Sequence, residues 1–387
     1  MNGQAIRGRE ILRYLRAQQP AMLRLLEKFV RFESPSFDKP AVDGFGELVG
    51  AEWERRGARV RLLRQARRGN HIRAELWDGN GRANGQIMVL GHLDTVYPLG
   101  TIATMPFRVL GRRAWGPGTF DMKGGHVQAL FAMDALRAAR ARLRKRLVFL
   151  WNSDEEIGSD SSRKVIESEA RRSDVVLVLE PSFGRDGRLK TTRKGVGTVE
   201  IIVTGRSAHA GIDPEKGVNA VHELALQIAQ LMKMNDRRRG IAVQATVIGG
   251  GTVSNVVPER ARAEVDVRFS RLADSAALER KLHSIQPILS GARVETRGGL
   301  SRPPLERTTA VGELFGRAKG LMHEMGLPLR EAATGGASDG NITAALGVPT
   351  LDGLGAVGDG AHSPREYLVI RAMPERAALL AGLLAAL

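Results

Sequence analysis

Three apolar segments of the sequence are each followed by residue types that bind divalent metals. Segment 87–90 precedes His92 and Asp94, segment 147–151 precedes Glu155 and Glu156, and segment 175–179 precedes Glu180. Unbroken apolar runs of this length are typical of strands buried on both faces of a parallel sheet. Because ligands bind beyond the carboxyl ends of such strands, these side chains predict a site for divalent metal ions, and we expect two of them.

His92 and Asp94 are separated by one residue, so in an extended chain both side chains point to the same side. A carboxylate beside an imidazole can accept its second N–H and fix the tautomer that binds the metal. We therefore expect His92 to be a ligand and Asp94 to orient it. The alternative is a capped turn with a surface histidine, which an isolated His-x-Asp sequence also permits.

Asp121 lies in a glycine-rich turn directly before a predicted helix. One interpretation is a helix N-cap, which aspartate favours strongly. The other is a carboxylate that bridges two metals, one oxygen to each, in a turn whose glycines let other groups approach closely. This residue alone does not decide between the two.

Glu155 and Glu156 are adjacent acids beyond a buried strand, where carboxylates are costly unless they are paired, protonated or bound to metal. Two roles are available to the pair: one carboxylate neutralises a metal, and the other takes a proton from a metal-bound water. Glu180, at the end of the next strand, can serve the second metal. The alternative is a set of surface acids that balance nearby arginines.

Two histidines outside these strands are further candidates. His362 lies in a loop without helical periodicity and can complete a metal site. His209 lies in a turn of small residues, far in sequence from the carboxylates, and can donate a hydrogen bond to a substrate oxyanion. The remaining histidines fall in strand or helix patterns and are interpreted as structural or exposed: His71, His126, His222, His283 and His323.

The order of periodic segments predicts an α/β catalytic domain interrupted by a smaller one. Residues 1–193 and 303–387 form the catalytic domain, with a mostly parallel central sheet flanked by helices. Residues 194–302 follow the β-α-β-β-α-β order of a ferredoxin-like α+β sandwich. The expected helices are 11–32 (broken near Pro20), 44–56, 125–142, 217–234, 274–285, 309–326 and 370–386, and the expected strands are 58–65, 71–78, 87–90, 147–151, 175–179, 195–205, 241–250, 260–270, 292–298 and 348–352.

The composition argues against several classes of function. The formal net charge is +16, but the basic residues are spread along the chain and aromatic residues make up only 5%, so stacking platforms for nucleic-acid bases are not expected. No apolar run is long enough to cross a membrane, and the N-terminal segment 1–20 does not resemble a secretory signal. Cysteine is absent, so the metal site must use N and O ligands. We expect a cytoplasmic enzyme that binds neither nucleic acid nor membranes.

Six motifs follow one another along nearly the whole chain, at 91–100, 115–125, 152–159, 179–182, 207–211 and 360–368: GHLDTVYPLG, WGPGTFDMKGG, NSDEEIGS, LEPS, SAHAG and GAHSPREYL. In this order and spacing they resemble the dizinc aminoacylase/carboxypeptidase family of metallopeptidases. The stretches GTVSNVVPERARAEVDVRFS and TGGASDGN are most similar to its glutamate carboxypeptidase branch. That branch removes C-terminal glutamate from N-acyl or folate-type substrates.

The resemblance implies two divalent ions, zinc or alternatively cobalt or manganese, and five ligands: His92 and Glu180 for one ion, Glu156 and His362 for the other, and Asp121 as the bridge. It implies that Glu155 is the general base and acid and that Asp94 orients His92. The smaller domain would be a lid through which two copies form a homodimer. In the family, the residue matching His209 reaches the active site of the partner subunit.

Arg268 is a candidate for substrate specificity. The alternating pattern of 262–269 places it on the polar face of a lid strand, where a guanidinium can grip a substrate carboxylate. In the related carboxypeptidases the matching arginine does so, helped by an asparagine at the position of Asn255. The alternative is a cross-strand ion pair with a neighbouring acid.

The expected function is that of a metal-dependent amidohydrolase or carboxypeptidase. It would release a C-terminal, glutamate-like amino acid from a small N-acyl or peptide substrate through a water activated by two metals. An N-acyl amino acid deacylase similar to acetylornithine deacetylase is the alternative within the enzymes. A non-catalytic binding protein of the same fold would lack a ligand or the base, and none is missing. A nucleic-acid-binding protein would carry a groove-reading motif, and none is present.

Overall fold

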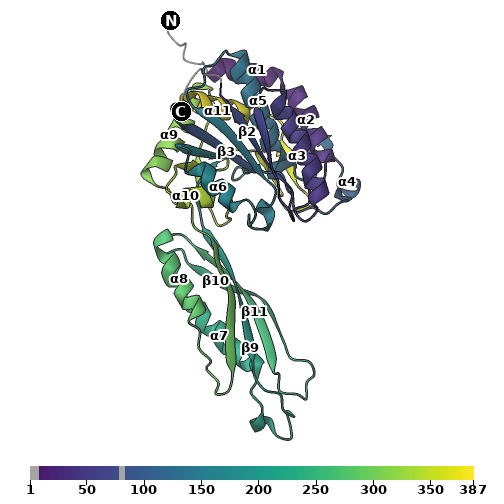
Figure 1. Cartoon of the computed structure of the whole chain (residues 1–387), viewed down its shortest axis with the longest axis vertical. Helices are drawn as coiled ribbons and strands as arrows, with labels where there is room; N and C mark the ends of the chain where they lie inside the picture. The colour runs from purple at the N-terminus through teal and green to yellow at the C-terminus, as the bar shows by residue number, and fades with distance from the viewer. Residues whose placement is uncertain (1–7, 78–82) are drawn as a thin grey trace. The chain divides into compact units, whose positions relative to one another are not determined.

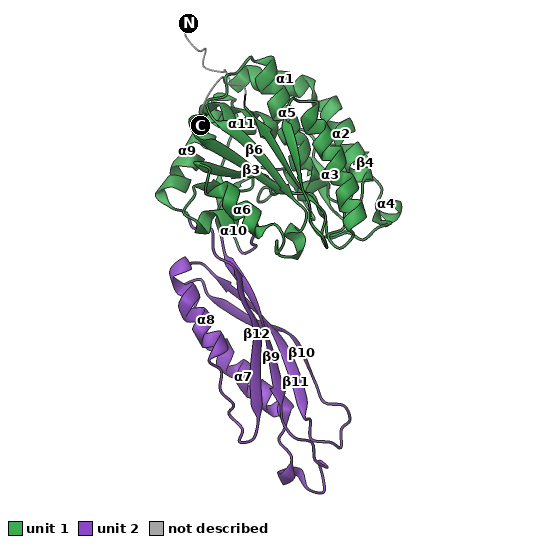
Figure 2. Ribbon diagram, viewed as in Figure 1, with its two compact units in different colours: residues 1–192, 307–334, 338–387 green, residues 193–306, 335–337 purple. Residues whose placement is uncertain are grey.

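The computed structural model describes residues 8–77 and 83–387, which form two compact units (Figure 2). Unit 1 contains the described residues up to 192 together with 307–334 and 338–387, and unit 2 contains 193–306 and 335–337. The expectation about a secretory signal falls partly on residues 1–7, and the strand expected at 71–78 ends on residue 78; both lie outside the described residues. Within the described part of the chain, no helix is long and apolar enough to cross a membrane.

Unit 1 is built on a six-stranded sheet in the order β1-β2-β6-β3-β7-β14. The strands β3, β6, β7 and β14 run parallel to one another, and β2 and β1 add two antiparallel strands at one edge. The strand bounds are β1 Arg59–Leu63, β2 His71–Leu76, β3 Gln86–His92, β6 Arg146–Asn152, β7 Val175–Val178 and β14 Thr350–Leu351. The mostly parallel α/β architecture expected from the sequence is confirmed.

Helices cover both faces of this sheet (Figure 1). Ile87 and Val89 of β3 pack into the larger apolar core, whereas Met88 and Leu90 face a smaller core on the opposite side. Both faces are therefore dry, which explains why the strand has no alternating pattern. The larger core contains α1 Gly8–Ala17, α2 Gln19–Arg31, α3 Lys39–Glu54, α5 Gly124–Ala138, α9 Thr309–Glu324 and α11 Ala372–Ala386, and the smaller one contains α6 Arg163–Ala170 and α10 Gly340–Ala345.

Proline and capping residues determine where the first three helices begin or end. The break expected near Pro20 separates α1 from α2, and the proline occupies the first turn of α2. Helix α3 begins five residues before the expected position 44, because Asp38 caps it and accepts a hydrogen bond from Ala41 N at 2.9 Å. The apolar periodicity starts later than the helix, so the expected boundary was too late.

Unit 1 also contains short strands and a short helix in its loops, which the apolar periodicity did not predict. A four-stranded sheet has the order β15-β16-β5-β4, with bounds β15 Gly358–Asp359, β16 Tyr367–Val369, β5 Arg113–Trp115 and β4 Arg108–Leu110. It is preceded by the one-turn helix α4 Thr101–Thr104, and a separate pair joins β8 Leu189–Arg193 to β13 Glu331–Thr334. Pairing of β16 with β5 places the loop after β15 beside the glycine-rich turn that follows β5.

Unit 2 has the element order β-α-β-β-α-β and an antiparallel sheet in the order β10-β11-β9-β12. Alternate residues such as Val199, Ile201 and Val265 are buried against the two helices, and the residues between them form the other, more polar face. The bounds are β9 Gly195–Thr204, α7 Ala220–Met232, β10 Ala242–Gly250, β11 Arg260–Phe269, α8 Ser275–His283 and β12 Arg293–Arg302.

Candidate metal centre

The carboxyl ends of β3, β6 and β7 bring the predicted ligands to one edge of the central sheet. In the parallel register His92 lies opposite Asn152, so the segments that follow these two strands leave the sheet together. The turn before α5 and the loop after β15 supply Asp121 and His362. The five predicted ligands fall into two groups that share one member: His92, Asp121 and Glu180 form the first, and Asp121, Glu156 and His362 form the second.

Asp121 divides its two carboxylate oxygens between these groups. Its Oδ1 lies 3.2 Å from His92 Nε2, which is also 3.4 Å from Glu180 Oε1. Its Oδ2 lies 3.5 Å from His362 Nε2, which is also 3.1 Å from Glu156 Oε2. This is the arrangement expected of a carboxylate that bridges two ions. The alternative of a helix N-cap is not seen, because Asp121 lies before the first turn of α5 and no side-chain cap bond is formed there.

The donor set fits two divalent cations. Within each group the N and O ligand atoms lie within 4.8 Å of one another, and N/O sets of imidazole and carboxylate suit zinc and its neighbours. Glu156 Oε1 is buried without a hydrogen-bond partner among the described residues, which leaves one acceptor directed at no donor of the chain. Burial, reinforced by the charge of Asp121, raises the pKa of Glu156 to about 7. Asp121, Glu156 and Glu180 bring three carboxylates together, and positive charge beside them favours their ionised forms.

The two histidines respond to the same concentration of negative charge. Burial acts to lower the pKa of His92, but the carboxylates of Asp121, Asp94 and Glu180 outweigh it and raise the pKa well above its ordinary value. Hydrogen bonds to Asp121 and Glu156 raise the pKa of His362 to about 11. Metal binding would therefore compete with protons at both rings.

Asp94 contacts the site in a different way from that expected. The closest acceptor to His92 Nδ1 is the backbone carbonyl of Asp94 at 2.9 Å, whereas the carboxylate Oδ1 lies 3.5 Å away. The carboxylate instead accepts hydrogen bonds from the backbone N–H groups of Glu155 and Glu156, each at 3.2 Å, and from Ser36 Oγ at 2.7 Å. Asp94 thus contacts His92 through its main chain and the Glu155–Glu156 turn through its side chain.

Glu155 and Glu156 lie in one 3₁₀ turn, Glu155–Ile157, directly after β6. Glu155 is buried and belongs to neither ligand group, whereas Glu156 belongs to the second. Asp154, directly before the turn, accepts a hydrogen bond from Ser161 N, beyond it, at 2.7 Å. Of the two adjacent acids, Glu156 therefore belongs to a ligand group and Glu155 does not.

Gly125 permits the close packing of α5 against the end of β7. A Cβ on Gly125 would lie 2.7 Å from the carbonyl oxygen of Leu179, which is closer than a real Cβ approaches an oxygen. Leu179 directly precedes Glu180, so this glycine lets the helix that follows Asp121 pack beside the strand end that carries Glu180.

Sequence reasoning missed Glu366, which contacts the Asp121 turn. Its fully buried carboxylate accepts hydrogen bonds from the backbone N–H groups of Phe120 and Asp121, and burial raises its pKa to about 7. The residue lies in the last of the six motifs, four positions after His362. Its place in that motif was the only sequence signal, because the three-residue strand β16, Tyr367–Val369, that follows it is too short to show a period.

The histidines interpreted as structural include two that are deeply buried beside the centre. His126 Nε2 lies 2.7 Å from the backbone carbonyl of His92, and burial lowers the pKa of His126 to about 3. His71 Nδ1 lies 3.0 Å from Ser153 Oγ, and burial lowers its pKa as well. Burial thus favours the neutral form of both rings, which hydrogen-bond to residues at the strand ends.

His209 is an exposed residue of unit 2, whereas all five ligands belong to unit 1. Its Nδ1 accepts hydrogen bonds from the backbone N–H groups of Gly211 and Ile212 at 3.1 and 3.0 Å. Because Nδ1 is the acceptor, the proton of the neutral ring resides on Nε2. Nε2 is therefore a hydrogen-bond donor that points away from its own turn.

Arg268 lies on the polar face of β11, as expected, and the structure pairs it with an acid. Its Nη2 and Nε lie 2.8 and 2.9 Å from the carboxylate of Asp266, two residues earlier on the same strand, and Nη1 donates to Gly335 O at 3.3 Å. The expected alternative was an ion pair across strands, and the observed pair lies along one strand. The guanidinium remains one-third exposed.

Asn255 does not lie beside Arg268 within unit 2. Arg268 pairs with Val196 at the beginning of β9, whereas Asn255 accepts from Ala210 N beyond the end of β9, next to His209. The ten residues of β9 span about 30 Å, so the two ends of the sheet are well separated. The expectation that Asn255 helps Arg268 hold one carboxylate does not apply to residues of the same copy.

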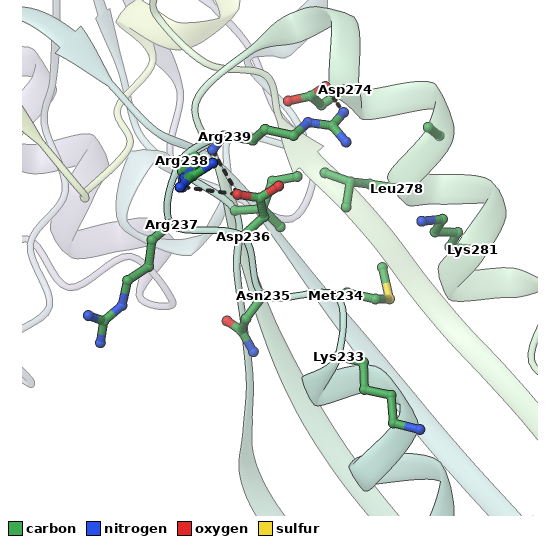
Figure 3. A pocket seen from close by; sticks show the side chains of 12 residues that line it. Lys233, Met234, Asn235, Asp236, Arg237, Arg238, Arg239, Asp274, Leu278 and Lys281 are labelled. Atoms are coloured by element: carbon green, nitrogen blue, oxygen red, sulfur yellow. Dashed lines mark hydrogen bonds and ion pairs between the residues drawn. The ribbon is translucent and has the colours of Figure 1, made fainter.

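A polar cavity with a volume of about 420 Å³ lies in unit 2 between α8 and the loop from α7 to β10 (Figure 3). Five of its twelve lining residues are basic, and its two acids are already engaged. Arg239 pairs with Asp274, and Asp236 accepts from the backbone N–H groups of Arg238 and Arg239 at 2.9 and 3.0 Å. None of its lining residues is a histidine, so this cavity does not offer the ligand set of a metal centre.

The chain has close relatives among known hydrolases. It is 33% identical over 373 residues to carboxypeptidase G2 from Pseudomonas sp. (strain RS-16), an alignment that covers 95% of this chain and 89% of the relative. It is 28% identical over 323 residues to a succinyl-diaminopimelate desuccinylase from Dechloromonas aromatica (strain RCB), covering 79% of this chain and 84% of the relative.

Solved structures share the fold over nearly the whole length. The aminopeptidase PepT from Bacillus cereus has a TM-score of 0.78 at 20% identity, covering 95% of this chain and 98% of that chain. The YXEP protein of Bacillus subtilis, described as a dinuclear metal binding peptidase from the M20 family, has a TM-score of 0.70 at 17% identity, covering 96% and 98%. Residues 88–386 match the profile of peptidase family M20/M25/M40, and with the relatives above this shows that the chain belongs to that family.

Proposed function

We propose that the protein is a metal-dependent carboxypeptidase that hydrolyses the last amide bond of an N-acyl amino acid or peptide and releases a glutamate-like amino acid. The observation that carries the proposal is the pair of ligand groups that share Asp121. The 33% identity to carboxypeptidase G2 supports the choice of a carboxypeptidase, and zinc is the ion that best suits the donor set.

His92 and Glu180 would hold one ion, Glu156 and His362 would hold the other, and Asp121 would contribute one oxygen to each. When bound, the ions would lower the pKa of a shared water and polarise the amide carbonyl. Asp94 keeps the backbone of the Glu155–Glu156 turn in place, so the ligand and its neighbouring acid are positioned by one carboxylate.

Glu155 is the proposed general base and acid. It would accept a proton from the attacking water as the new C–O bond forms, and it would pass that proton to the amine nitrogen as the C–N bond breaks. The products are a carboxylic acid and a free amine, and the carboxylate of Glu155 is regenerated. Its place outside both ligand groups supports this role, because its oxygens are not required by the ions.

His209 is the proposed donor to the oxyanion. Its backbone-fixed Nδ1 leaves Nε2 protonated, which is the form needed to donate to a developing negative charge. Arg268 is the proposed contact of the substrate α-carboxylate. Asp266 accepts from both Nε and Nη2 of its guanidinium and so orients the guanidinium plane.

We propose that residues 194–302 act as a lid on a catalytic domain of residues 1–193 and 303–387, and that two copies form a dimer through the β10 edge of the lid. β10 is an edge strand on which Val247 and Ile248 are 46% and 63% exposed. The opposite edge, β12, carries Arg293 and Arg297 instead. An apolar, unpaired strand edge is a site of strand pairing with another chain. Light scattering of the wild type and of Ile248→Lys tests this, and a wild-type monomer would refute it.

The proposed dimer would also explain how residues at opposite ends of the lid sheet serve one active site. Arg268 and His209 lie about one strand length apart in the same copy, too far for both to touch one small substrate. Two copies resolve this if Arg268 comes from one lid and His209, with Asn255, comes from the other. Each catalytic centre then requires residues of both chains.

The second candidate function is an N-acyl amino acid deacylase, favoured by the 28% identity to the desuccinylase. Both candidates use the same centre and differ in the amino acid released. Incubation of the zinc-loaded protein with N-acyl-glutamate, glutamyl peptides, a folate and N-acetylornithine, followed by amine detection, separates them. Glutamate release supports the carboxypeptidase, and ornithine release supports the deacylase. Absence of any hydrolysis with zinc, cobalt or manganese would refute both. A cytoplasmic location and the absence of nucleic-acid binding stay predictions, testable by cell fractionation and a gel shift.

A further inference from the structure

Glu366 is a buried carboxylate to which the proposed reaction gives no role. Its Oε1 accepts from Phe120 N at 2.7 Å and Asp121 N at 2.9 Å. Its Oε2 accepts from Gly118 N at 3.1 Å and from the Tyr97 hydroxyl at 2.5 Å. Three of these four donors are backbone groups of the turn that presents Asp121, so one side chain accepts three N–H groups of that turn.

The turn has a backbone shape that requires such an acceptor. Gly118 begins it in the left-handed region at φ 71°, and the N–H groups that follow converge on one point. Converging backbone N–H groups form a concave site for an anion, and here the anion is supplied by the chain itself. A buried N–H without an acceptor is unfavourable, so the conformation that aims Asp121 depends on Glu366.

Glu366 also links this turn to the other loops that supply ligands. It lies four residues after His362 on the loop between β15 and β16, so one loop supplies a ligand and fixes the bridging residue. Tyr97 follows His92 and Asp94 on the loop after β3, and its hydroxyl lies 3.0 Å from Ser363 O. Tyr97 and Glu366 therefore join three segments that each carry a ligand.

We propose that Glu366, supported by Tyr97, is a positioning residue that keeps Asp121 where it belongs to both ligand groups. The inference rests on the proposed dimetal function. Because Asp121 belongs to both ligand groups, a displaced Asp121 weakens binding of both ions rather than of one. Outer partners of metal ligands have this kind of influence, and their loss costs about 10- to 100-fold in metal affinity or activity.

The test substitutes Glu366→Gln, which keeps the size of the side chain and replaces one acceptor oxygen by an NH₂ donor. The matched control is Glu223→Gln in unit 2. Glu223 is also fully buried, and it accepts from Ile288 N, Leu289 N and Gln227 Nε2. Zinc affinity is measured by competition with a chromogenic chelator, and thermal stability is measured as the melting temperature of the metal-free protein. The turnover rate is measured at saturating zinc.

We expect Glu366→Gln to bind both zinc ions about 10- to 100-fold more weakly and to lower kcat while KM stays near the wild-type value. Glu223→Gln should lower the melting temperature and leave zinc affinity unchanged, since a purely structural buried acid does not act on the metals. Tyr97→Phe removes one of the four donors and should weaken zinc binding to a smaller extent. This variant decides the question if Glu366→Gln does not fold.

Zinc affinity of Glu366→Gln within about twofold of wild type overturns the inference, as does an equal loss in Glu223→Gln. If Glu366→Gln does not fold, Tyr97→Phe with unchanged zinc affinity overturns it. A wild-type protein that binds no zinc refutes the proposed function itself, so the two failures are distinguishable.

Discussion

Replacement of Glu155 by Gln separates the chemical step from metal binding. Glu155 belongs to neither ligand group, and its backbone N–H is held by Asp94 Oδ1 at 3.2 Å, so an amide side chain should occupy the same position. General acid–base catalysis contributes about 10²- to 10⁴-fold to a rate. Glu155 is proposed to move the same proton twice, so we expect a loss in kcat of about 10⁴-fold, equivalent to about 5.4 kcal/mol in activation free energy.

The assay is the steady-state rate of glutamate release at saturating zinc, together with the metal content of the purified variant. We expect the variant to bind two zinc ions per chain and to show a rate close to the detection limit of the assay. The matched control is the neighbour, Glu156→Gln, whose Oε2 lies 3.1 Å from His362 Nε2 and which should lose metal as well as activity. A Glu155→Gln variant that retains more than about one-tenth of wild-type kcat would show that another group is the base. Loss of zinc from that variant would show that the roles of the two acids are exchanged.

Three further outcomes are expected. Chelation should abolish turnover, and added Zn²⁺, Co²⁺ or Mn²⁺ should restore it; a rate unaffected by chelation contradicts a metal mechanism. Arg268→Ala should raise KM by about tenfold or more for substrates with a free α-carboxylate, because a charge-assisted hydrogen bond contributes about 1.5–3 kcal/mol; an equal effect on amidated analogues would indicate a structural role. Burial lowers the pKa of His126 to about 3, so the folded protein keeps this ring neutral while the unfolded chain binds a proton below about pH 6.5. Stability should therefore fall as pH decreases from 6.5 towards 3, by up to about 1.4 kcal/mol per pH unit from this residue; urea unfolding of His126→Gln should show a shallower dependence, and an unchanged slope would contradict the assignment.

The central sheet was predictable because both of its faces are dry. Ile87 and Met88 face different apolar cores, so the apolar runs have no alternation and end where the backbone reaches polar surroundings. The acids at those ends were visible for the same reason. The short strands β4, β5, β15 and β16 were not predictable, because two or three residues contain no period to detect.

The candidate ligands were identified from sequence, but the contacts that hold them were not. Glu366 accepts from Asp121 N across 245 residues of sequence, and no spacing rule relates two such positions. Asp94 was expected to act by its carboxylate on His92, and its backbone carbonyl has the closer contact. The expected partnership of Arg268 with Asn255 stays a prediction, because the two residues lie near opposite ends of β9 in one copy and the resemblance does not say which chain supplies each one.

The interrupted course of the chain determines the order in which its parts can fold during synthesis. The central sheet of unit 1 is completed by β14, and its larger core by α9 and α11, all of which follow residue 306 in the sequence. Nearly all of unit 2 is one continuous segment, 193–306. At a synthesis rate of about 5–20 residues per second, the residues after 306 require several seconds to appear. We therefore expect unit 2 to fold before unit 1. During that interval the N-terminal strands of unit 1 would remain unfolded on the ribosome, with apolar surface exposed, and would depend on chaperones.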